Sequence, residues 1–445
     1  MRRKNVLLYK IFISILAFLL VFQIQGASIG VGILEEFSLK MSNNTTEMIE
    51  LNDYTYRFFP IHIHGDDELQ RLNFWRTGVI KGKGTFDDPY IISGWKIDCI
   101  QWFWEFLNPH VTHNNAAIWL ENIHCHVVIE DNLLYNLHQE KDDNWFEGIY
   151  IEECSNITIR NNNIKDSSYG ITMAYSPSST VCSNEVSSSY IGIVSHSLSS
   201  ENPIEIYDNS AFYCGDGIRC VNGNAEVFDN EIKYNGEGIV LMSDSSHIAS
   251  NNVFNNQEVG IKCVDSPALV EYNNVNDNGG WGIGIKGGPT PMISRNTISN
   301  NQNSGIYLAD GDVDIENNSI LFNEGYGIYI ADGRGDIVHN LIHGNPIGIR
   351  PIDDSKIFYN EISSNTKYGI RFGGSNPIIH YNNIEDNKYG LYRQGGKPWV
   401  SAEFNWWGAA DGPGGDGPGS GDPVTYQAIY TPWLTSPCLT AGPID

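Results

Sequence analysis

Residues 292–308 read MISRNTISNNQNSGIYL, and residues 314–330, 22 positions further on, read DIENNSILFNEGYGIYI. The two stretches share an Ile, an Asn, a second Ile and a Gly-Ile pair at the same offsets. Apolar residues that alternate with other residues over a few positions are typical of a strand with one buried face. A unit of this length that recurs along a chain indicates a solenoid.

A glycine followed by an aliphatic residue marks each repeat. The following residue is Ile in eleven repeats and Leu391 in the twelfth, and the residue two further on is usually apolar, so both positions should face a common interior. The intervals are 21 to 25 residues, and the glycines are Gly148, Gly170, Gly192, Gly217, Gly238, Gly260, Gly282, Gly305, Gly327, Gly348, Gly369 and Gly390.

An asparagine is the second landmark of the repeat. It has an apolar residue three positions before it and, in nearly every repeat, another two positions after it, as Ile293 and Ile298 flank Asn296. Each repeat thus contains three short strands separated by bends. An Asn tolerates left-handed backbone and can bind turn amides through its side chain, so we expect a structural asparagine ladder. Its members are Asn132, Asn162, Asn184, Asn209, Asn230, Asn251, Asn273, Asn296, Asn318, Asn340, Asn360, Asn382 and Asn405.

These columns predict an all-β fold, a single-stranded right-handed parallel β-helix with about 22 residues per coil and roughly 12 to 14 coils. The expected domains are residues 1–26 as a signal peptide or N-terminal membrane anchor, 27–57 as a linker, 58–98 as an N-terminal cap with the first coil, 99–407 as the β-helix, and 408–445 as a Gly/Asp/Pro-rich C-terminal cap.

Charge and the N-terminus bear on location and partners. The basic start and the uncharged run from Ile11 to Phe22 predict export to a secreted, periplasmic or cell-surface location, with membrane contact only if the segment stays uncleaved. The 445-residue chain has a net charge of −26, and without residues 1–26 it has 23 basic and 53 acidic residues. Such an excess of acids argues against nucleic acid as a partner.

The Gly-Ile and Asn-x-Ile columns resemble the parallel β-helix repeats of pectin-active enzymes and of NosD-like exported proteins, over roughly residues 58–434. The pectin-lyase-like resemblance implies the fold more strongly than a function. The Asn-Thr-Asp and Gly-His-Gly motifs of polygalacturonases are absent, so any enzyme activity should be of the polysaccharide lyase or epimerase type. A NosD-like role would imply copper handling, but no Met-rich motif is present.

The outward position two residues after the glycine suggests a ligand surface. It carries Tyr307, Tyr329, Arg350, Arg371 and Tyr392 in the last coils, and further aromatic residues precede several of the glycines. Aromatic rings offer apolar faces to sugars, and arginines pair with carboxylates or sulfates. We therefore predict a polysaccharide-binding face, with the alternative that the tyrosines only stabilise stacked strands.

Four charged residues in adjacent coils form the best catalytic candidate. Asp216 and Glu237 precede their glycines, beside Arg219 and Lys262, so paired carboxylates could divide acid and base roles or hold calcium. Charges on a solvated face are the simpler interpretation.

The sequence contains few candidate metal ligands and no clear disulfide pairing. His124 and His126 should lie on the outward face of one strand as a candidate metal pair, and Asp411, Asp416 and Asp422 are weaker candidates for calcium. Calcium or copper is thus a candidate cofactor, and the sequence requires neither. Cys220 and Cys263 share an interior column two coils apart, too far for a disulfide, whereas pairings of other cysteines stay open.

Together these patterns predict an exported β-helix that binds, and in a stronger version modifies, extracellular or cell-surface polysaccharide. Two alternatives stay open. One is a NosD-like copper-handling accessory protein, and the other is a structural surface or adhesion module without a small ligand.

Overall fold

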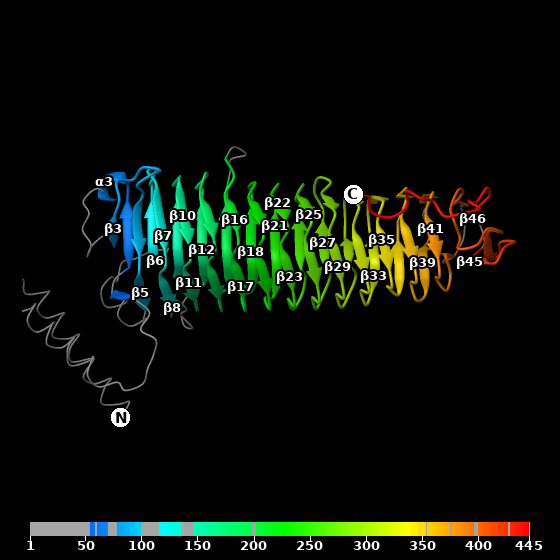
Figure 1. Ribbon diagram of the computed structural model, residues 1–445, viewed down its shortest axis with the longest axis horizontal. Helices are drawn as coiled ribbons and strands as arrows, with labels where there is room; N and C mark the ends of the chain where they lie inside the picture. The colour runs from blue at the N-terminus through cyan, green and yellow to red at the C-terminus, as the bar shows by residue number, and fades with distance from the viewer. Residues whose placement is uncertain are drawn as a thin grey trace, which may run out of the picture. The chain divides into compact units, whose positions relative to one another are not determined.

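The structure is a computed structural model, and it describes residues 54–57, 60–69, 78–98, 115–135, 137, 146–197, 202–352, 354–373, 376–395, 399–425 and 428–444. All of these belong to one compact unit, Tyr54–Asp445. The predicted signal peptide and most of the predicted linker lie outside the described residues. Figure 1 shows the coils of this unit stacked in chain order.

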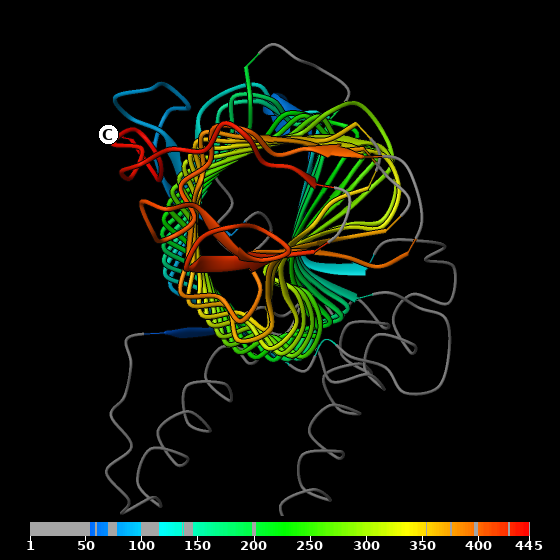
Figure 2. The ribbon, with the colours of Figure 1, turned by 90° about the vertical axis from the view of Figure 1, so that its right-hand side faces the viewer.

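The strands form three sheets, and each repeat contributes one strand to each sheet, as the three apolar segments per repeat predict. Among the described strands every pair is parallel except β3 with β4, which is antiparallel. Viewed along the stack, the sheets surround a common interior (Figure 2). The predicted parallel β-helix is confirmed.

Sheet A contains 14 strands in the order β1 (Thr55–Arg57), β5 (Trp95–Asp98), β8 (Leu133–Tyr135), β11 (Asn163–Lys165), β14 (Glu185–Ser187), β17 (Ser210–Phe212), β20 (Glu231–Lys233), β23 (Asn252–Phe254), β26 (Asn274–Asn276), β29 (Thr297–Ser299), β32 (Ser319–Leu321), β35 (Leu341–His343), β38 (Glu361–Ser363) and β41 (Asn383–Glu385).

Sheet B, which carries the Gly-Ile column, contains 16 strands in the order β2 (Ile61–His64), β6 (Asn115–Glu121), β9 (Phe146–Glu152), β12 (Tyr169–Ala174), β15 (Ile191–His196), β18 (Asp216–Val221), β21 (Glu237–Met242), β24 (Ile261–Val264), β27 (Ile283–Lys286), β30 (Ile306–Leu308), β33 (Tyr326–Ile330), β36 (Ile347–Arg350), β39 (Tyr368–Phe372), β42 (Leu391–Arg393), β45 (Gly421–Val424) and β44 (Pro413–Gly415).

Sheet C contains 16 strands in the order β3 (Val79–Lys81), β4 (Tyr90–Ser93), β7 (Val127–Glu130), β10 (Ile157–Arg160), β13 (Thr180–Cys182), β16 (Glu205–Tyr207), β19 (Glu226–Phe228), β22 (His247–Ala249), β25 (Leu269–Glu271), β28 (Met292–Ser294), β31 (Asp312–Glu316), β34 (Arg334–Val338), β37 (Lys356–Phe358), β40 (Ile378–His380), β43 (Val400–Ser401) and β46 (Ala428–Ile429). Among the described residues the one helix is α3 (Asp66–Leu69).

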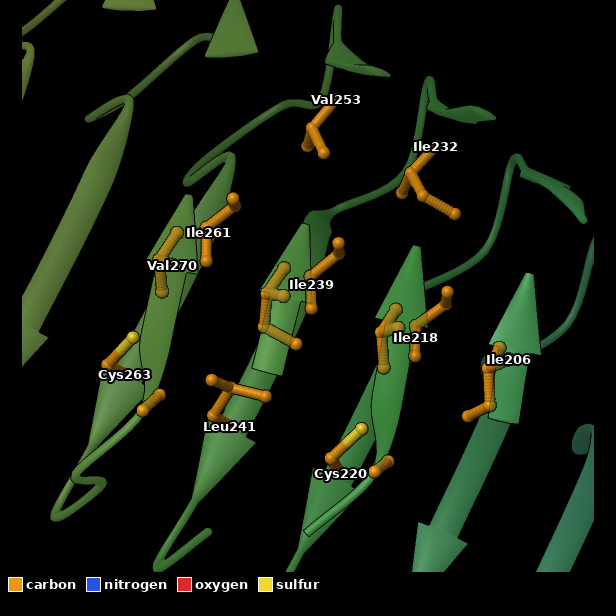
Figure 3. Close-up of a cluster of buried hydrophobic side chains, with 14 of the residues drawn as sticks. Ile206, Ile218, Cys220, Ile232, Ile239, Leu241, Val253, Ile261, Cys263 and Val270 are labelled. Atoms are coloured by element: carbon orange, nitrogen blue, oxygen red, sulfur yellow. The ribbon is translucent and has the colours of Figure 1, made fainter. Parts of the chain in front are cut away.

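The interior consists of stacked aliphatic columns. Ile218, Ile239 and Ile261 lie in register on successive strands of sheet B, and Cys220, Leu241 and Cys263 form the next column (Figure 3). None of the six is more than 1% exposed. Equivalent apolar positions meet one coil apart, so the core extends along one axis.

The predicted asparagine ladder is present at the bend between sheets C and A. Asn296 Oδ1 accepts hydrogen bonds from the backbone N and the Nδ2 of Asn273, both in the preceding coil. Its own Nδ2 donates to Asn318 Oδ1 and to two backbone carbonyls. The asparagine side chains therefore form a continuous buried row of hydrogen bonds. This row satisfies backbone N–H and C=O groups at the bend from the interior.

The ladder asparagines themselves do not adopt the left-handed backbone that Asn tolerates. The residue before each ladder asparagine has the positive φ, for example Arg295 with φ 54° and Tyr381 with φ 60°. These residues include Tyr, Arg and Phe, which rarely adopt this conformation. The inward asparagine controls the turn, and the left-handed residue points its side chain outward.

A second asparagine ladder, which the sequence analysis missed, lies at the bend between sheets A and B. Asn278 Oδ1 accepts from the N and Nδ2 of Asn256, and Asn278 repeats this pattern onto Asn301. The ladder contains Asn235, Asn256, Asn278, Asn301, Asn323, Asn345, Asn365 and Asn387. Each lies five residues after a first-ladder asparagine, which is a spacing that the sequence displays.

The Gly column has a steric cause. A Cβ at Gly305 would lie 2.8 Å from the backbone oxygen of Gly327 and 2.9 Å from Asn323 Nδ2. Successive coils therefore approach so closely at this bend that a side chain would separate them, and the second ladder can form beside the glycines.

The chain ends by turning back over earlier coils. The N of Cys438 donates to Asn383 Oδ1, the N of Gly442 donates to the Tyr359 carbonyl, and the N of Ile444 donates to Asn317 Oδ1. In Figure 1 the C-terminus accordingly lies back along the stack, beside β35.

Candidate functional site

The outer face of sheet B carries the predicted polysaccharide-binding residues in one column. Tyr307 pairs in register with Tyr329, Tyr329 with Arg350, and Arg371 with Tyr392. All are half-buried. With the aromatic residues beside them they form what we call the aromatic–arginine strip, which contains Trp281, Tyr307, Tyr326, Tyr329, Arg350, Tyr368, Arg371, Tyr389 and Tyr392.

The strip is an almost continuous series of ring contacts. Trp281 stacks on Tyr307 with centroids 4.1 Å apart, and Tyr307 meets Tyr329 edge to face at 5.3 Å. Further along, Tyr368 stacks on Tyr392 at 4.4 Å. These contacts use several ring faces within the protein, so a bound sugar would meet ring edges and hydroxyl groups as well as faces.

Both arginines of the strip lie over tyrosine rings. The Arg350 Cζ is 4.4 Å from the centroid of Tyr329, and the Arg371 Cζ is 5.8 Å from that of Tyr368. Arg371 Nη2 also donates to Gln394 Oε1 at 2.5 Å. A guanidinium held by a ring keeps its N–H donors available for a carboxylate or sulfate and loses less side-chain entropy when it binds one.

Charge is unevenly distributed along sheet B. Within the described residues, the sheet B strands β27, β30, β33, β36, β39 and β42 contain no Asp or Glu but include Lys286, Arg350 and Arg371. Strands β2, β6, β9 and β12 contain Glu121, Glu147 and Glu152 but no Lys or Arg. The face therefore runs from an acidic half to a basic half.

The four residues of the catalytic candidate come together as two ion pairs. Arg219 donates through Nε to Asp216 Oδ2 at 2.6 Å, and Lys262 Nζ donates to Glu237 Oε1 at 2.5 Å. Burial raises the pKa of Asp216, and the Arg219 charge opposes that shift. Each carboxylate is thus already paired with a basic residue on the same face of the sheet. The negative charge that it could offer to a substrate is correspondingly smaller.

The prediction that His124 and His126 share a strand was wrong. Strand β6 ends at Glu121, Asn122 has φ 55°, and both histidines lie in the bend before β7. Asp66 Oδ1 accepts hydrogen bonds from the backbone N of His124 and of Cys125, which holds the bend in place. Strand alternation therefore does not set the directions of the two rings.

Other metal candidates are also separated. Asp411 accepts hydrogen bonds from Ser420, whereas Asp422 binds Asn387 at the end of the second ladder. Among the described residues no group of three or more His, Cys, Asp or Glu side chains is arranged to hold a metal ion. The seven cysteines of the described part, Cys125, Cys154, Cys182, Cys214, Cys220, Cys263 and Cys438, are free thiols, and Cys99 lies outside it.

One acidic residue on this face was missed by sequence reasoning. Glu147 lies in β9, directly before Gly148, and is 4% exposed. Burial raises its pKa to about 8, and the neighbouring Thr172 hydroxyl opposes this shift only in part. The available signal was its position, since Asp216 and Glu237 also precede a column glycine.

Comparison with known families agrees with this architecture. A sequence model described as the right handed beta helix region matches residues 97–254, 148–298 and 281–406. The chain belongs to the right-handed β-helix family. Membership in this family establishes the fold, and it leaves the ligand of the outer face open.

Solved structures similar to this chain include two alginate-modifying enzymes. A variant of the periplasmic alginate epimerase AlgG is 13% identical, with a TM-score of 0.46 over 71% of this chain and 84% of that chain. The A-module of the mannuronan C-5 epimerase AlgE4 from Azotobacter vinelandii is 16% identical, with a TM-score of 0.37 over 65% and 84%. Comparison with curated proteins gives no match.

The described part of the chain contains no helix long and apolar enough to cross a bilayer. The predicted signal peptide or anchor, residues 1–26, lies outside that part and remains a sequence-based prediction.

Proposed function

We propose that this protein is exported and binds an acidic polysaccharide along the aromatic–arginine strip. The observation that carries the proposal is that Arg350 and Arg371 lie over tyrosine rings on a stretch of sheet B whose strands contain no acid. The protein as a whole has a net charge of −26, so a basic surface of this kind stands out from its surroundings. A polyanion would be repelled by most of the surface and attracted to this strip.

The geometry suits an extended chain. Side chains of one column leave the sheet at steps of ~4.8 Å, so one glycan could contact several coils at once. Each contact needs to supply only a part of the affinity, because ordering of the flexible glycan opposes binding. We propose binding without chemistry, since Asp216 and Glu237 are already neutralised by Arg219 and Lys262.

Calorimetric titration with a polyuronate at low and at high salt tests this function. Replacing both arginines, Arg350→Ala with Arg371→Ala, should weaken binding by about tenfold or more at low salt and reduce its salt dependence. Tyr329→Ala should weaken binding and leave the salt dependence unchanged.

The matched control is Arg334→Ala, which removes an exposed arginine of sheet C that pairs with Asp312. It should bind the polyuronate as the wild type does, and circular dichroism should show all variants folded. Equal affinity of the wild type and the double arginine variant, or no binding to a broad panel of acidic glycans, would leave the strip as a ladder that only stabilises stacked strands.

A further inference from the structure

Glu147 is a buried acid without a basic partner in the described part of the chain. It lies on the outer face of sheet B, in register with Ala116 on one side and Tyr169 on the other. Its Oε2 is inaccessible to solvent and has no hydrogen-bond partner among the described residues. Burying a carboxylate in this way is unfavourable unless a positive charge accompanies it.

The same face shows how the fold usually meets this need. Asp216, which is 6% exposed, has Arg219 beside it, and Glu237 has Lys262. The strands around Glu147, namely β2, β6, β9 and β12, contain no Lys or Arg in their described residues. Glu147 therefore has no Lys or Arg beside it on these described strands, in contrast to Asp216 and Glu237.

The surroundings of Glu147 favour positive charge. Glu152 lies on the same strand, and it pairs in register with Glu121, whose carboxylate the rings of His62 and His64 contact. Burial is the main cause that raises the pKa of Tyr150 above its usual value, and the charges of Glu152 and Glu147 add to the shift. A proton thus leaves Tyr150 with difficulty, as expected where the local potential is negative.

Aromatic rings accompany these acids. His62 stacks on Trp119 with centroids 4.1 Å apart, and Trp119 meets Tyr150 edge to face at 5.6 Å. Tyr150 is 7% exposed and packs with Ala116 and Ala174 in a small apolar cluster outside the main core. Carboxylates next to aromatic rings are the groups that bind organic cations, through ion pairing and cation–π attraction.

We propose that Glu147, with Glu152, Tyr150 and Trp119, forms a binding site for a primary ammonium group carried by a glycan, that is, a non-acetylated amino sugar. This inference rests on the proposed glycan-binding role of sheet B and assigns a second ligand chemistry to its acidic half. When the ammonium group enters, Glu147 releases its carboxyl proton to solvent, and the ammonium group keeps all of its own protons.

The test is calorimetry on the full chain at pH 6 with a hexamer of β-1,4-linked glucosamine, and with the N-acetylated hexamer as the matched ligand. At this pH Glu147, whose pKa is about 8, is protonated before binding. We expect the glucosamine hexamer to bind about tenfold more tightly than the acetylated one. Titration in two buffers of different ionisation enthalpy should show that binding releases close to one proton.

Two variants locate the effect. Glu147→Gln keeps the shape of the side chain, so it should remain folded, and it should abolish the proton release and the preference for the non-acetylated hexamer. Glu205→Gln, which changes an exposed acid on β16 of sheet C, should behave as the wild type does.

Unchanged affinity or unchanged proton release in Glu147→Gln would overturn this inference, as would equal binding of the two hexamers. The polyuronate titration separates it from the proposed function. If the arginine-dependent polyuronate binding is present and the glucosamine hexamer does not bind, this inference alone is wrong. If neither glycan binds, both are wrong.

Discussion

Asp422 shows how a single residue ends a repeating structure. Its Oδ2 accepts hydrogen bonds from the backbone N and the Nδ2 of Asn387, at 3.0 and 2.8 Å, in the place of a next asparagine. The sequence alone suggested Asp422 as a weak candidate calcium ligand. Burial is the main cause that raises its pKa to about 6, and the hydrogen bonds from Asn387 oppose the shift.

The raised pKa of Asp422 predicts a pH dependence of stability. The folded protein holds this proton more tightly than the unfolded chain, so the contribution of Asp422 to stability should be most favourable below about pH 4 and should decrease as the pH rises through 6. Asp422→Asn keeps an accepting oxygen without the charge. At pH 8 it should therefore stabilise the folded state by about 1 to 2 kcal/mol, with little effect at pH 4.

Urea unfolding of the wild type and Asp422→Asn at the two pH values measures this effect. Asp411→Asn is a suitable control, because Asp411 is exposed and lies outside the ladder. A stabilisation that is the same at pH 4 and pH 8 would mean that Asp422 is not the titrating group.

At the scale of the element, the two asparagine ladders hold the bends of each coil. Removing the side chain of Asn296 leaves the backbone N and the Nδ2 of Asn273 without their acceptor. Because both donors are buried, Asn296→Ala should destabilise by about 1 to 3 kcal/mol. Asn318→Ala should have a similar effect, since it accepts the same two bonds from Asn296.

The second ladder offers a comparison in the same coil. Asn301→Ala removes the acceptor of the N and Nδ2 of Asn278 and should lower the free energy of unfolding by a similar amount. Asn276→Ala, which changes a partly exposed asparagine on β26, is the control and should stay within about 0.5 kcal/mol of the wild type. Unfolding midpoints of the ladder variants that equal the wild type would contradict this account of both bends.

At the scale of the whole molecule, stability should be local along the stack. Each coil contacts its neighbours, so a change at one end has little effect at the other. The C-terminal segment is an exception, because it connects Ile444 to Asn317 across several coils. It acts as a strap over the ridge formed by the bends between sheets C and A.

Deleting residues 438–445 should therefore loosen a defined region. We expect faster amide hydrogen exchange in β32, β38 and β41, whose coils hydrogen-bond to the strap, and unchanged exchange in β12 to β21. Exchange read by mass spectrometry on the full chain and on the shortened chain would show this. A uniform increase along all coils, or no increase, would mean that the strap does not stabilise the last coils locally.

The amino-acid sequence by itself determined what recurs with the repeat. The aliphatic columns, the first ladder and the column of Tyr307, Tyr329 and Arg350 were all predictable, because in a solenoid each residue meets its own counterpart one coil away. The second ladder was equally visible as an Asn five residues after the first, and it was overlooked. Periodicity alone carries this information, since register follows from it.

Only the tertiary structure decided the contacts that do not recur. Asn122 turns the chain before His124, Asp422 meets Asn387 from 35 residues away, and Ile444 reaches Asn317. The surroundings of Glu147 do not recur either. The residues beside it belong to the neighbouring coils, and the residue type at outward positions varies from coil to coil. Such partners depend on which segments fold next to each other, and a repeat constrains the inward positions far more strongly than the outward ones.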